Sequence, residues 1–577
     1  MQNKSKPATL SNILVFILIL NLVCCKQSAN NNPIYNITKS VTSDSAMVVS
    51  AHPLATQIGI DIIKQGGNAV DAAVAVQLAL AVCYSGAGNI GGGGFMLYRS
   101  NDGEISALDY REKAAAAATT DMYLDSAGNP IPEKSMFGHL AAGVPGSIDG
   151  MVKSFERYSK IKDWKKVVQP AIDLAEKGYQ ITKREANNLN ENQAKFNKYN
   201  LTPTSFQKAD WKEGDILVQK DLAKTLVSIR DFGRAGFYEG KVADLIVKEM
   251  KDGGGIISHD DLKNYESIWR KPVTTTYRGN KIISMPPPSS GGIVLIQMLK
   301  MVEPYNLGEM KFQSAAAAHL IVEAERRAYA DRAQYLGDPD FFNVPAVKLI
   351  DSTYISNRMK DFNPRMAGKS ANISYGFIES SETTHLSIVD KEGNAVAVTT
   401  TLNGGYGSFT VVKGAGFILN NEMDDFSVKP GSPNMYGLVG AEANKIEPNK
   451  RMLSSMTPTI IERDGKLKMV VGTPGGSTII TSVFQTIVNV LDFGMDADQA
   501  VQSPRFHHQW LPDVIMLEKD AIQPSERKIM QDIGHTFKDR EQIGRVEAIV
   551  VGSDGKLHGA ADRRGDDDAK GYTKIKD

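Results

Sequence analysis

Two groups of threonines flank one short segment of this 577-residue chain. Thr383 and Thr384 open "TTHLSIVDKEGNAVAVTTTLN", and the run from Thr399 to Thr401 lies near its end. A threonine hydroxyl is a weak nucleophile and needs a base, which a chain-terminal threonine carries as its own α-amine. That amine titrates at about 7.7–8.0, near neutral pH. Thr383 reaches this state only if the peptide bond after Glu382 is cut.

The Thr383 hydroxyl is itself able to make that cut. It can attack the carbonyl of Glu382 if the fold strains the bond and supplies donors for the oxyanion. Thr401, across a predicted hairpin, is placed to hydrogen-bond the Thr383 hydroxyl. Paired threonines at the start of a strand are also favoured by β-propensity alone, so this stretch by itself leaves both interpretations open.

The elements around the threonines predict a layered fold. Residues 384–390 and 395–401 alternate apolar and polar side chains about the turn "KEGN", which predicts a hairpin. "TPTIIERDGKLKMVVG" predicts a second hairpin that leads into an apolar helix, and residues 54–64 and 69–82 read as helices. The end, "GRVEAIVVGSDGKLHGAADRRGDDDAKGY", predicts one more hairpin and a polar tail. Strands in the middle with helices on both sides indicate an α+β sandwich.

Four consecutive glycines, Gly91 to Gly94, precede the predicted strand "FMLYRS". A phosphate-binding loop would require a following Lys and Ser or Thr and would lead into a helix. The run therefore predicts close backbone packing or a tight turn.

Composition excludes several classes of protein and site. Lys plus Arg and Asp plus Glu both number 66, which argues against nonspecific nucleic-acid binding. Beyond Cys24 and Cys25 only Cys83 remains, so the mature body can form neither an intrachain disulfide nor a cysteine-based metal site. His507 and His508 are adjacent, and nothing nearby completes a zinc site, so we predict no metal.

The N-terminus has the features of an export signal. Lys4 and Lys6 precede the apolar run 13–23, which is too short to span a bilayer but suits a signal-peptide core. The run ends at Cys24 and Cys25, which fits a bacterial lipoprotein site with Cys25 lipidated as well as a plain cleaved signal over 1–25. We expect a periplasmic protein or one that is lipid-anchored to the cell envelope.

Several motifs, in order, resemble the γ-glutamyltransferases or glutathione hydrolases of the N-terminal-nucleophile hydrolase superfamily. Besides the threonine segment they are "GGNAVDAAVA", "GNIGGGGFM", "LDYREKAAAAA", "GFILNNEMDDFS", "PNKRMLSSMTPTI", "GTPGGS" and "PRFHHQWLPD". The resemblance runs from about Met47 to Tyr572; Ala115 replaces the proline that usually follows "REKA". It implies a four-layer αββα sandwich, built jointly by a large subunit, 26–382, and a small catalytic subunit, 383–577.

The resemblance also implies roles for individual residues. Thr383 matches the nucleophile, Thr401 the supporting hydroxyl, and Glu382–Thr383 the cleavage site. The remaining matches are Arg111 for the substrate α-carboxylate, Ser454 and Ser455 as its assistants, Asn403, Glu422 and Asp425 for the α-amine, Gly475 and Gly476 as oxyanion donors, and Tyr436 at the tip of a lid loop.

These residue types suit a γ-glutamyl group, which carries an ammonium and a carboxylate on one carbon. Arginine grips a carboxylate with a forked pair of donors, and carboxylates accept charge-assisted bonds from an ammonium. The implied reaction forms a γ-glutamyl-enzyme from glutathione or another γ-glutamyl compound. Water, or an amino acid or dipeptide acceptor, then releases it, and no cofactor is implied.

Each residue also has a simpler interpretation when it is taken alone. Arg111 could pair with Glu112 at the surface, the Asp424–Asp425 pair could cap a turn, and the Ser and Gly pairs could be ordinary strand-edge and turn residues. Two rival functions stay open. One is a glutaryl or cephalosporin acylase of the same superfamily, for which Asp425 would be an uncompensated charge. The other is a non-catalytic envelope lipoprotein that binds amino acids and needs no chain cleavage.

Overall fold

Two seven-stranded sheets form the centre of the protein. The computed structural model describes residue 2 and residues 34–373, 383–429 and 441–573, and residues from Ile37 on form one compact unit. The β17 sheet has the order β1 (Ser40–Ser43), β18 (Leu557–Ala561), β17 (Glu547–Val551), β13 (Lys466–Gly472), β12 (Thr459–Arg463), β9 (Asn280–Ser284), β8 (Val273–Tyr277). The β10 sheet has the order β19 (Asp568–Tyr572), β2 (Ala46–Ser50), β10 (Thr384–Val389), β11 (Ala395–Thr401), β3 (Gly93–Arg99), β4 (Ile105–Tyr110), β7 (Ile268–Arg270).

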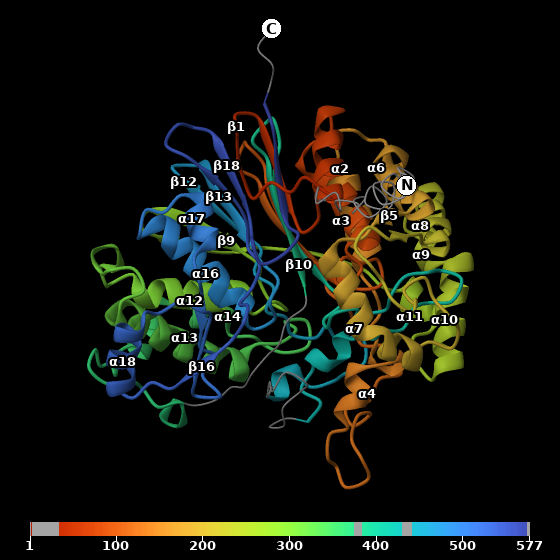
Figure 1. Cartoon of the computed structure of the whole chain (residues 1–577). Coiled ribbons are helices and arrows are strands. Elements are labelled where there is room, and N and C mark those ends of the chain that lie inside the picture. The colour runs from red at the N-terminus through yellow and green to blue at the C-terminus, as the bar shows by residue number, and fades with distance from the viewer. Residues whose placement is uncertain (1, 3–33, 374–382, 430–440, 574–577) are drawn as a thin grey trace. The chain divides into compact units, whose positions relative to one another are not determined.

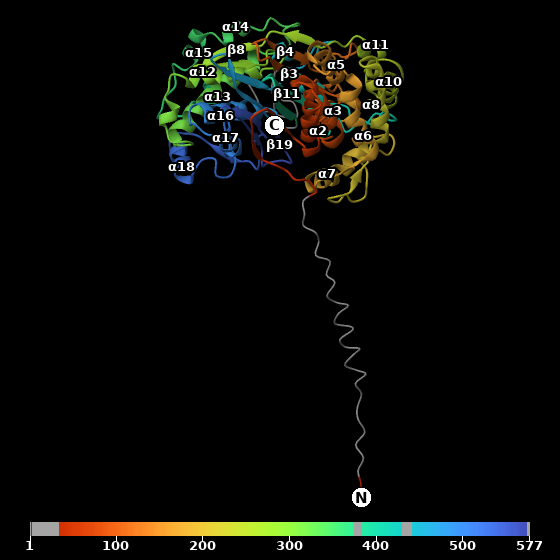
Figure 2. The ribbon, with the colours of Figure 1, turned by 90° about the horizontal axis from the view of Figure 1, so that it is seen from above.

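Helices cover the outer face of each sheet (Figures 1 and 2). The β10 sheet is covered by α2 (Pro53–Lys64), α3 (Ala69–Cys83), α5 (Ser147–Tyr158), α6 (Trp164–Lys177), α7 (Lys183–Tyr199), α8 (Lys220–Phe232) and α10 (Gly240–Gly253). The β17 sheet is covered by α12 (Gly291–Val302), α13 (Ala315–Tyr335), α15 (Ser352–Arg358), α16 (Thr478–Leu491), α17 (Ala497–Gln502) and α18 (Pro524–Asp532). None of the helices in the described ranges has both the length and the apolarity to cross a bilayer.

The two faces of β11 show why four layers form. Val396 and Val398 belong to the apolar cluster beneath α2 and α3, whereas Ala395 and Ala397 belong to the cluster between the two sheets. Side chains alternate along a strand, so the apolar residues 395–398 of β11 are buried on both of its faces. The predicted αββα sandwich is therefore confirmed.

The hairpin prediction is confirmed in register. Thr384 pairs with Thr400, and Val389 pairs with Ala395. The predicted polar tail is wrong, because Asp568–Tyr572 is the edge strand β19, which pairs with β2. Asp568 accepts a hydrogen bond from the Thr38 backbone N–H at 2.7 Å, so a contact from the far end of the chain stabilises this polar strand.

The glycine run packs as predicted. A Cβ on Gly92 would lie 2.1 Å from the Thr401 carbonyl oxygen, and one on Gly93 would lie 2.5 Å from the Tyr110 carbonyl oxygen. Only glycine permits these approaches. The run thus lets β3 begin close beside the end of β11 and the end of β4.

Candidate active site

Thr383 lies at the start of an interior strand of its sheet. It immediately precedes β10 and is 4% exposed. Because Thr384 pairs with Thr400, continuing the antiparallel register by one residue places Thr383 opposite Thr401. The Thr401 hydroxyl oxygen accepts a hydrogen bond from the Asn403 backbone N–H at 2.7 Å. The two predicted catalytic threonines therefore share one end of the sandwich, which we name the Thr383 end.

Arg111 follows β4 at the same end and is 1% exposed. Its Nη1 lies 2.6 Å from Glu422 Oε2, and its Nη2 donates to Asp425 Oδ2. It also donates to the carbonyl oxygens of Met452 at 3.3 Å and Leu453 at 3.1 Å. Arg111 is thus the centre of a buried ion-pair cluster, and the interpretation as a surface arginine is wrong.

The cluster contains more acidic groups than basic ones. Glu112 is buried too, with its Oε2 3.5 Å from Arg111 Nη1. Burial raises the pKa of Glu422 and Asp425 above their usual ranges, and the charge of Arg111 opposes this shift. Within the described residues Asp425 Oδ1 accepts no hydrogen bond. Three carboxyl groups around one guanidinium leave the pocket suited to a second cation.

The two serines belong to a neighbouring polar network. The Ser455 hydroxyl accepts a hydrogen bond from Arg332 Nη2 at 2.8 Å, and the Ser454 carbonyl accepts one from the Ser290 N–H at 2.7 Å. Arg332 Nε also donates to the Ser290 hydroxyl at 2.9 Å, and the charge of Arg332 counteracts part of the rise in the pKa of Asp425. The sequence reasoning missed Arg332, since charged residues occur on every face of α13.

Gly475 and Gly476 form the turn between β13 and α16. Their φ angles of 137° and 57° lie in the region that favours glycine. No described residue accepts a hydrogen bond from either N–H, although their carbonyls accept bonds from Thr478 N at 3.1 Å and Ile479 N at 3.1 Å. Both N–H groups lie at the start of a helix, where backbone donors favour negative charge.

The glycine turn lies at the Thr383 end. A Cβ on Gly472, the last residue of β13, would lie 2.2 Å from the ring of His385 on β10. The turn therefore follows β13 at the level where β10 begins. Two predicted residues, Glu382 and Tyr436, lie outside the described residues, so the cleavage carbonyl and the lid stay predictions.

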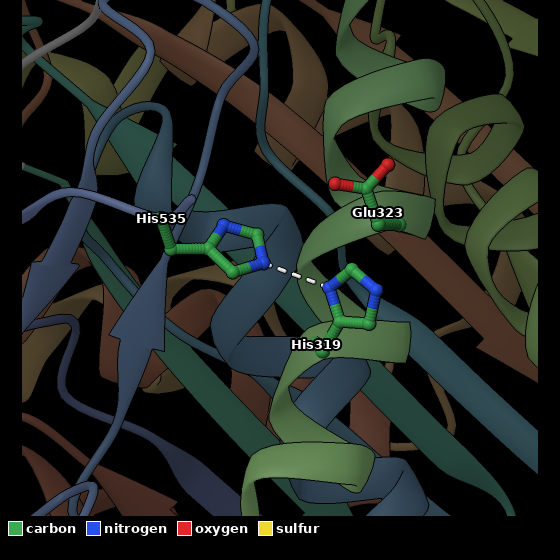
Figure 3. Close-up of side chains that lie close together, drawn as sticks. All are labelled: His319, Glu323 and His535. Carbon is green, nitrogen blue, oxygen red and sulfur yellow. Dashed lines mark hydrogen bonds between the residues drawn. The ribbon is translucent and has the colours of Figure 1, made fainter. Parts of the chain in front are cut away.

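A cluster with metal-ligand chemistry lies elsewhere in the fold, and the sequence analysis missed it (Figure 3). His319 and Glu323 on α13 approach His535, and the potential ligand atoms lie within 4.8 Å of one another. His319 Nδ1 and His535 Nε2 already share a hydrogen bond of 2.7 Å. Glu323 is paired with Arg326 at 3.2 Å and also with Arg327, and two guanidinium groups disfavour a cation. We assign no metal to this cluster, and the absence of a metal stays a prediction.

Buried neutral histidines predict an acid-sensitive fold. Burial lowers the pKa of His385 and of His507 to about 3. The unfolded chain binds protons at about pH 6.5, so this stability is present above pH 6.5 and is lost as pH falls towards 3. We expect the free energy of unfolding to fall by up to about 1.4 kcal/mol per pH unit for each such histidine.

Denaturant titration at pH 7, 6 and 5 measures this slope. His507 contacts Thr481 at 2.8 Å and Gln509 at 2.6 Å, and His507→Gln should flatten the slope. The exposed His259 provides the matched control, His259→Gln, which should leave the slope unchanged. A free energy that stays constant between pH 7 and 5 would contradict the prediction.

Comparison with known proteins places the chain in a family. The "Gamma-glutamyltranspeptidase" family profile matches residues 55–572. A "Glutathione hydrolase proenzyme" of Escherichia coli (strain K12) is 46% identical over 534 residues, which cover 92% of each protein. An "Acylase ACY 1 proenzyme" of Pseudomonas sp. (strain V22) is 35% identical over 541 residues, covering 92% of this chain and 94% of that one.

The solved structures support the fold. The crystal structure of a cephalosporin acylase from Bacillus halodurans superposes with a TM-score of 0.81, covering 95% of this chain and 99% of that chain. At 23% identity this likeness concerns the fold alone. From the family profile and the relative at 46% identity, the chain belongs to the gamma-glutamyltranspeptidase family and is an enzyme of the glutathione hydrolase type.

Proposed function

We propose that this enzyme matures by cutting itself between Glu382 and Thr383. The Thr383 Oγ attacks the Glu382 carbonyl carbon, the C–N bond breaks, and an ester replaces the amide; water then hydrolyses the ester. The products are a large chain ending at Glu382 and a small chain whose Thr383 has a free α-amine. Support comes from the fold, because small-chain strands β10 and β11 pair with large-chain strands β2 and β3 in one sheet. The two chains would thus stay together after the cut.

The acid-rich cluster supports recognition of a γ-glutamyl head. In the substrate-free protein Arg111 is neutralised by Glu422 and Asp425. A substrate carboxylate would take over the Arg111 donors while its ammonium takes the two carboxylates, so the internal ion pairs of Arg111 with Glu422 and Asp425 are exchanged for pairs with the substrate. Such a pocket discriminates against an analogue without the amine, which would leave a buried charge unpaired. This cluster beside Thr383 is the observation that carries the proposal.

Thr383 and the glycine turn would perform the chemistry. The α-amine takes the proton of the Thr383 hydroxyl as its oxygen attacks the γ-carbonyl, with Thr401 orienting the nucleophile. The free N–H groups of Gly475 and Gly476 would stabilise the oxyanion, each by about 3 kcal/mol. The leaving amine receives the proton, and water or the amine of an amino acid or dipeptide then cleaves the ester.

Chain cleavage and donor preference together test this function. We expect two bands on a denaturing gel, with the smaller chain beginning Thr-Thr-His-Leu-Ser, and turnover of γ-glutamyl-p-nitroanilide well above that of glutaryl-p-nitroanilide. The reverse donor preference would make the chain an acylase. One full-length band without turnover would instead support a binding lipoprotein.

We also propose that the enzyme is exported and held in the periplasm or on the envelope. The charged and apolar residues before Cys25 support this, and they lie outside the described residues. Fractionation of cells that express the wild type and Cys25→Ala distinguishes the two forms. If Cys25 carries a lipid anchor, Cys25→Ala should move the enzyme from the membrane fraction to the soluble periplasmic fraction. Recovery of the wild-type enzyme in the cytoplasmic fraction would contradict export.

A further inference from the structure

A cavity of about 400 Å³ adjoins the glycine turn. Its lining includes Gly475 and three arginines, Arg184, Arg540 and Arg545, together with one acidic residue, the exposed Glu541. We name it the arginine cavity. The cavity and the proposed oxyanion site share Gly475.

Two of these arginines lack the acidic partners that buried arginines have elsewhere in the fold. Arg505, for comparison, lies 2.9 Å from Asp562. Arg540 is half-buried, and its Nη1 donates to the Met516 sulfur at 3.6 Å. Arg184, also half-buried, donates to the Arg564 carbonyl oxygen at 2.6 Å. Neither guanidinium forms an ion pair with any residue in the described part of the chain.

The cavity therefore has a surplus of positive charge. Arg545 is buried, and its Nε lies 3.8 Å from Asp567, so its charge is offset in part. Burial lowers the pKa of Arg540, and the charge of Glu518 opposes this shift. Half-buried guanidinium groups that form no ion pair with a described carboxylate make a site for an anion, and arginine suits a carboxylate because of its forked donors.

The order of the strands puts this cavity opposite the γ-glutamyl pocket. In the β10 sheet, β11, β3 and β4 lie on one side of β10 and lead to Thr401 and Arg111. On the other side lies β2, whose last residue, Ser50, pairs with Leu386 near the start of β10. Two residues after Ser50, the His52 Nε2 atom lies 3.8 Å from Oε2 of Glu185, and Glu185 follows Arg184 in the sequence.

A γ-glutamyl amide must extend on both sides of its carbonyl carbon. Its amino-acid head would lie towards Arg111, so its leaving amine points to the β2 side. We propose that the arginine cavity binds the carboxylate of the leaving peptide and of an amino acid or dipeptide acceptor. Both ligands bind at the same position, because the acceptor amine approaches the acyl carbon from the side on which the leaving amine departs. This inference rests on the proposed function and assigns its second subsite.

Paired substrates that differ only in one carboxylate test the site. With a γ-glutamyl donor, glycylglycine is compared with glycylglycinamide as acceptor; separately, glutathione is compared with its glycine amide as donor. We expect the wild type to prefer the carboxylate form by about 10- to 100-fold in kcat/KM, as charge-assisted hydrogen bonds imply. Arg540→Gln and Arg184→Gln should each reduce this ratio by about tenfold. Ratios within one protein cancel any general loss of activity.

Arg157→Gln is the matched control. Arg157 pairs with Glu104 at 3.0 Å on the exposed surface of α5 and should keep the wild-type ratio. If the cavity variants keep the wild-type ratio of carboxylate to amide substrates in both comparisons, the cavity does not bind the carboxylate. If only the acceptor comparison or only the donor comparison changes, the cavity binds only the acceptor or only the leaving peptide, and the proposal of one shared position is wrong. If Arg540→Gln does not mature, Arg184→Gln decides, because among the described residues the Arg184 guanidinium hydrogen-bonds to the Arg564 carbonyl and to no carboxylate. A wild type without γ-glutamyl turnover would instead defeat the proposed function.

Discussion

Replacing Thr383 by alanine is expected to leave one uncut chain with no γ-glutamyl turnover. The change removes the oxygen that attacks the Glu382 carbonyl, so the α-amine of residue 383 is never released. Cleavage and catalysis fail together because one hydroxyl performs both. We expect kcat/KM for γ-glutamyl-p-nitroanilide to fall by at least about 10⁴-fold. Gel electrophoresis and the anilide assay on the same preparation measure both effects.

Two variants separate this mechanism from a local folding defect. Thr383→Ser keeps the hydroxyl and should give two chains. Thr384→Val replaces the adjacent threonine, which is buried and whose hydroxyl has no hydrogen-bond partner in the described ranges, by a residue of similar shape. It should mature and turn over substrate. Normal two-chain maturation of Thr383→Ala would refute the mechanism.

Local patterns predicted the fold where side-chain alternation is strong. The β10–β11 hairpin follows from its alternation and its turn. Of the two helices that cover it, α2 follows from a helical run closed by Gly66 and Gly67, and α3 follows from an alanine-rich apolar run. The edge strands β1 and β19 were missed. They carry few apolar residues and are held by partners more than 500 residues away, such as Thr38 N–H on Asp568. No local pattern encodes such contacts.

The site, like the fold, was predicted from local motifs only in part. The motifs predicted Thr401, Arg111, Glu422 and Asp425 as one group, and the structure brings Arg111 into contact with both acids. The sequence could not indicate that these opposite charges neutralise one another before substrate binds, because this depends on packing between β4 and the segment after β11. For the same reason Arg540, which forms no ion pair with any described residue, was missed.

Replacing Asp425 by asparagine is expected to remove most of the preference for γ-glutamyl over glutaryl donors. The side chain keeps its shape but loses the charge that would face the substrate ammonium, while Glu422 continues to neutralise Arg111 at 2.6 Å. Removing one partner of a buried ion pair costs about 3–5 kcal/mol. We therefore expect kcat/KM for γ-glutamyl-p-nitroanilide to fall about 100- to 4,000-fold, with a much smaller change for the glutaryl compound.

The neighbouring aspartate provides the control for this preference. Asp424 is also buried, but it accepts a hydrogen bond from the Ser135 hydroxyl at 2.5 Å and lies outside the Arg111 ion pairs. Asp424→Asn should keep the wild-type donor ratio even if it lowers stability. If Asp425→Asn reduced turnover of both donors equally, Asp425 would serve to hold Arg111 in place. The ammonium would then have to be bound by Glu422 and Asn403 without it.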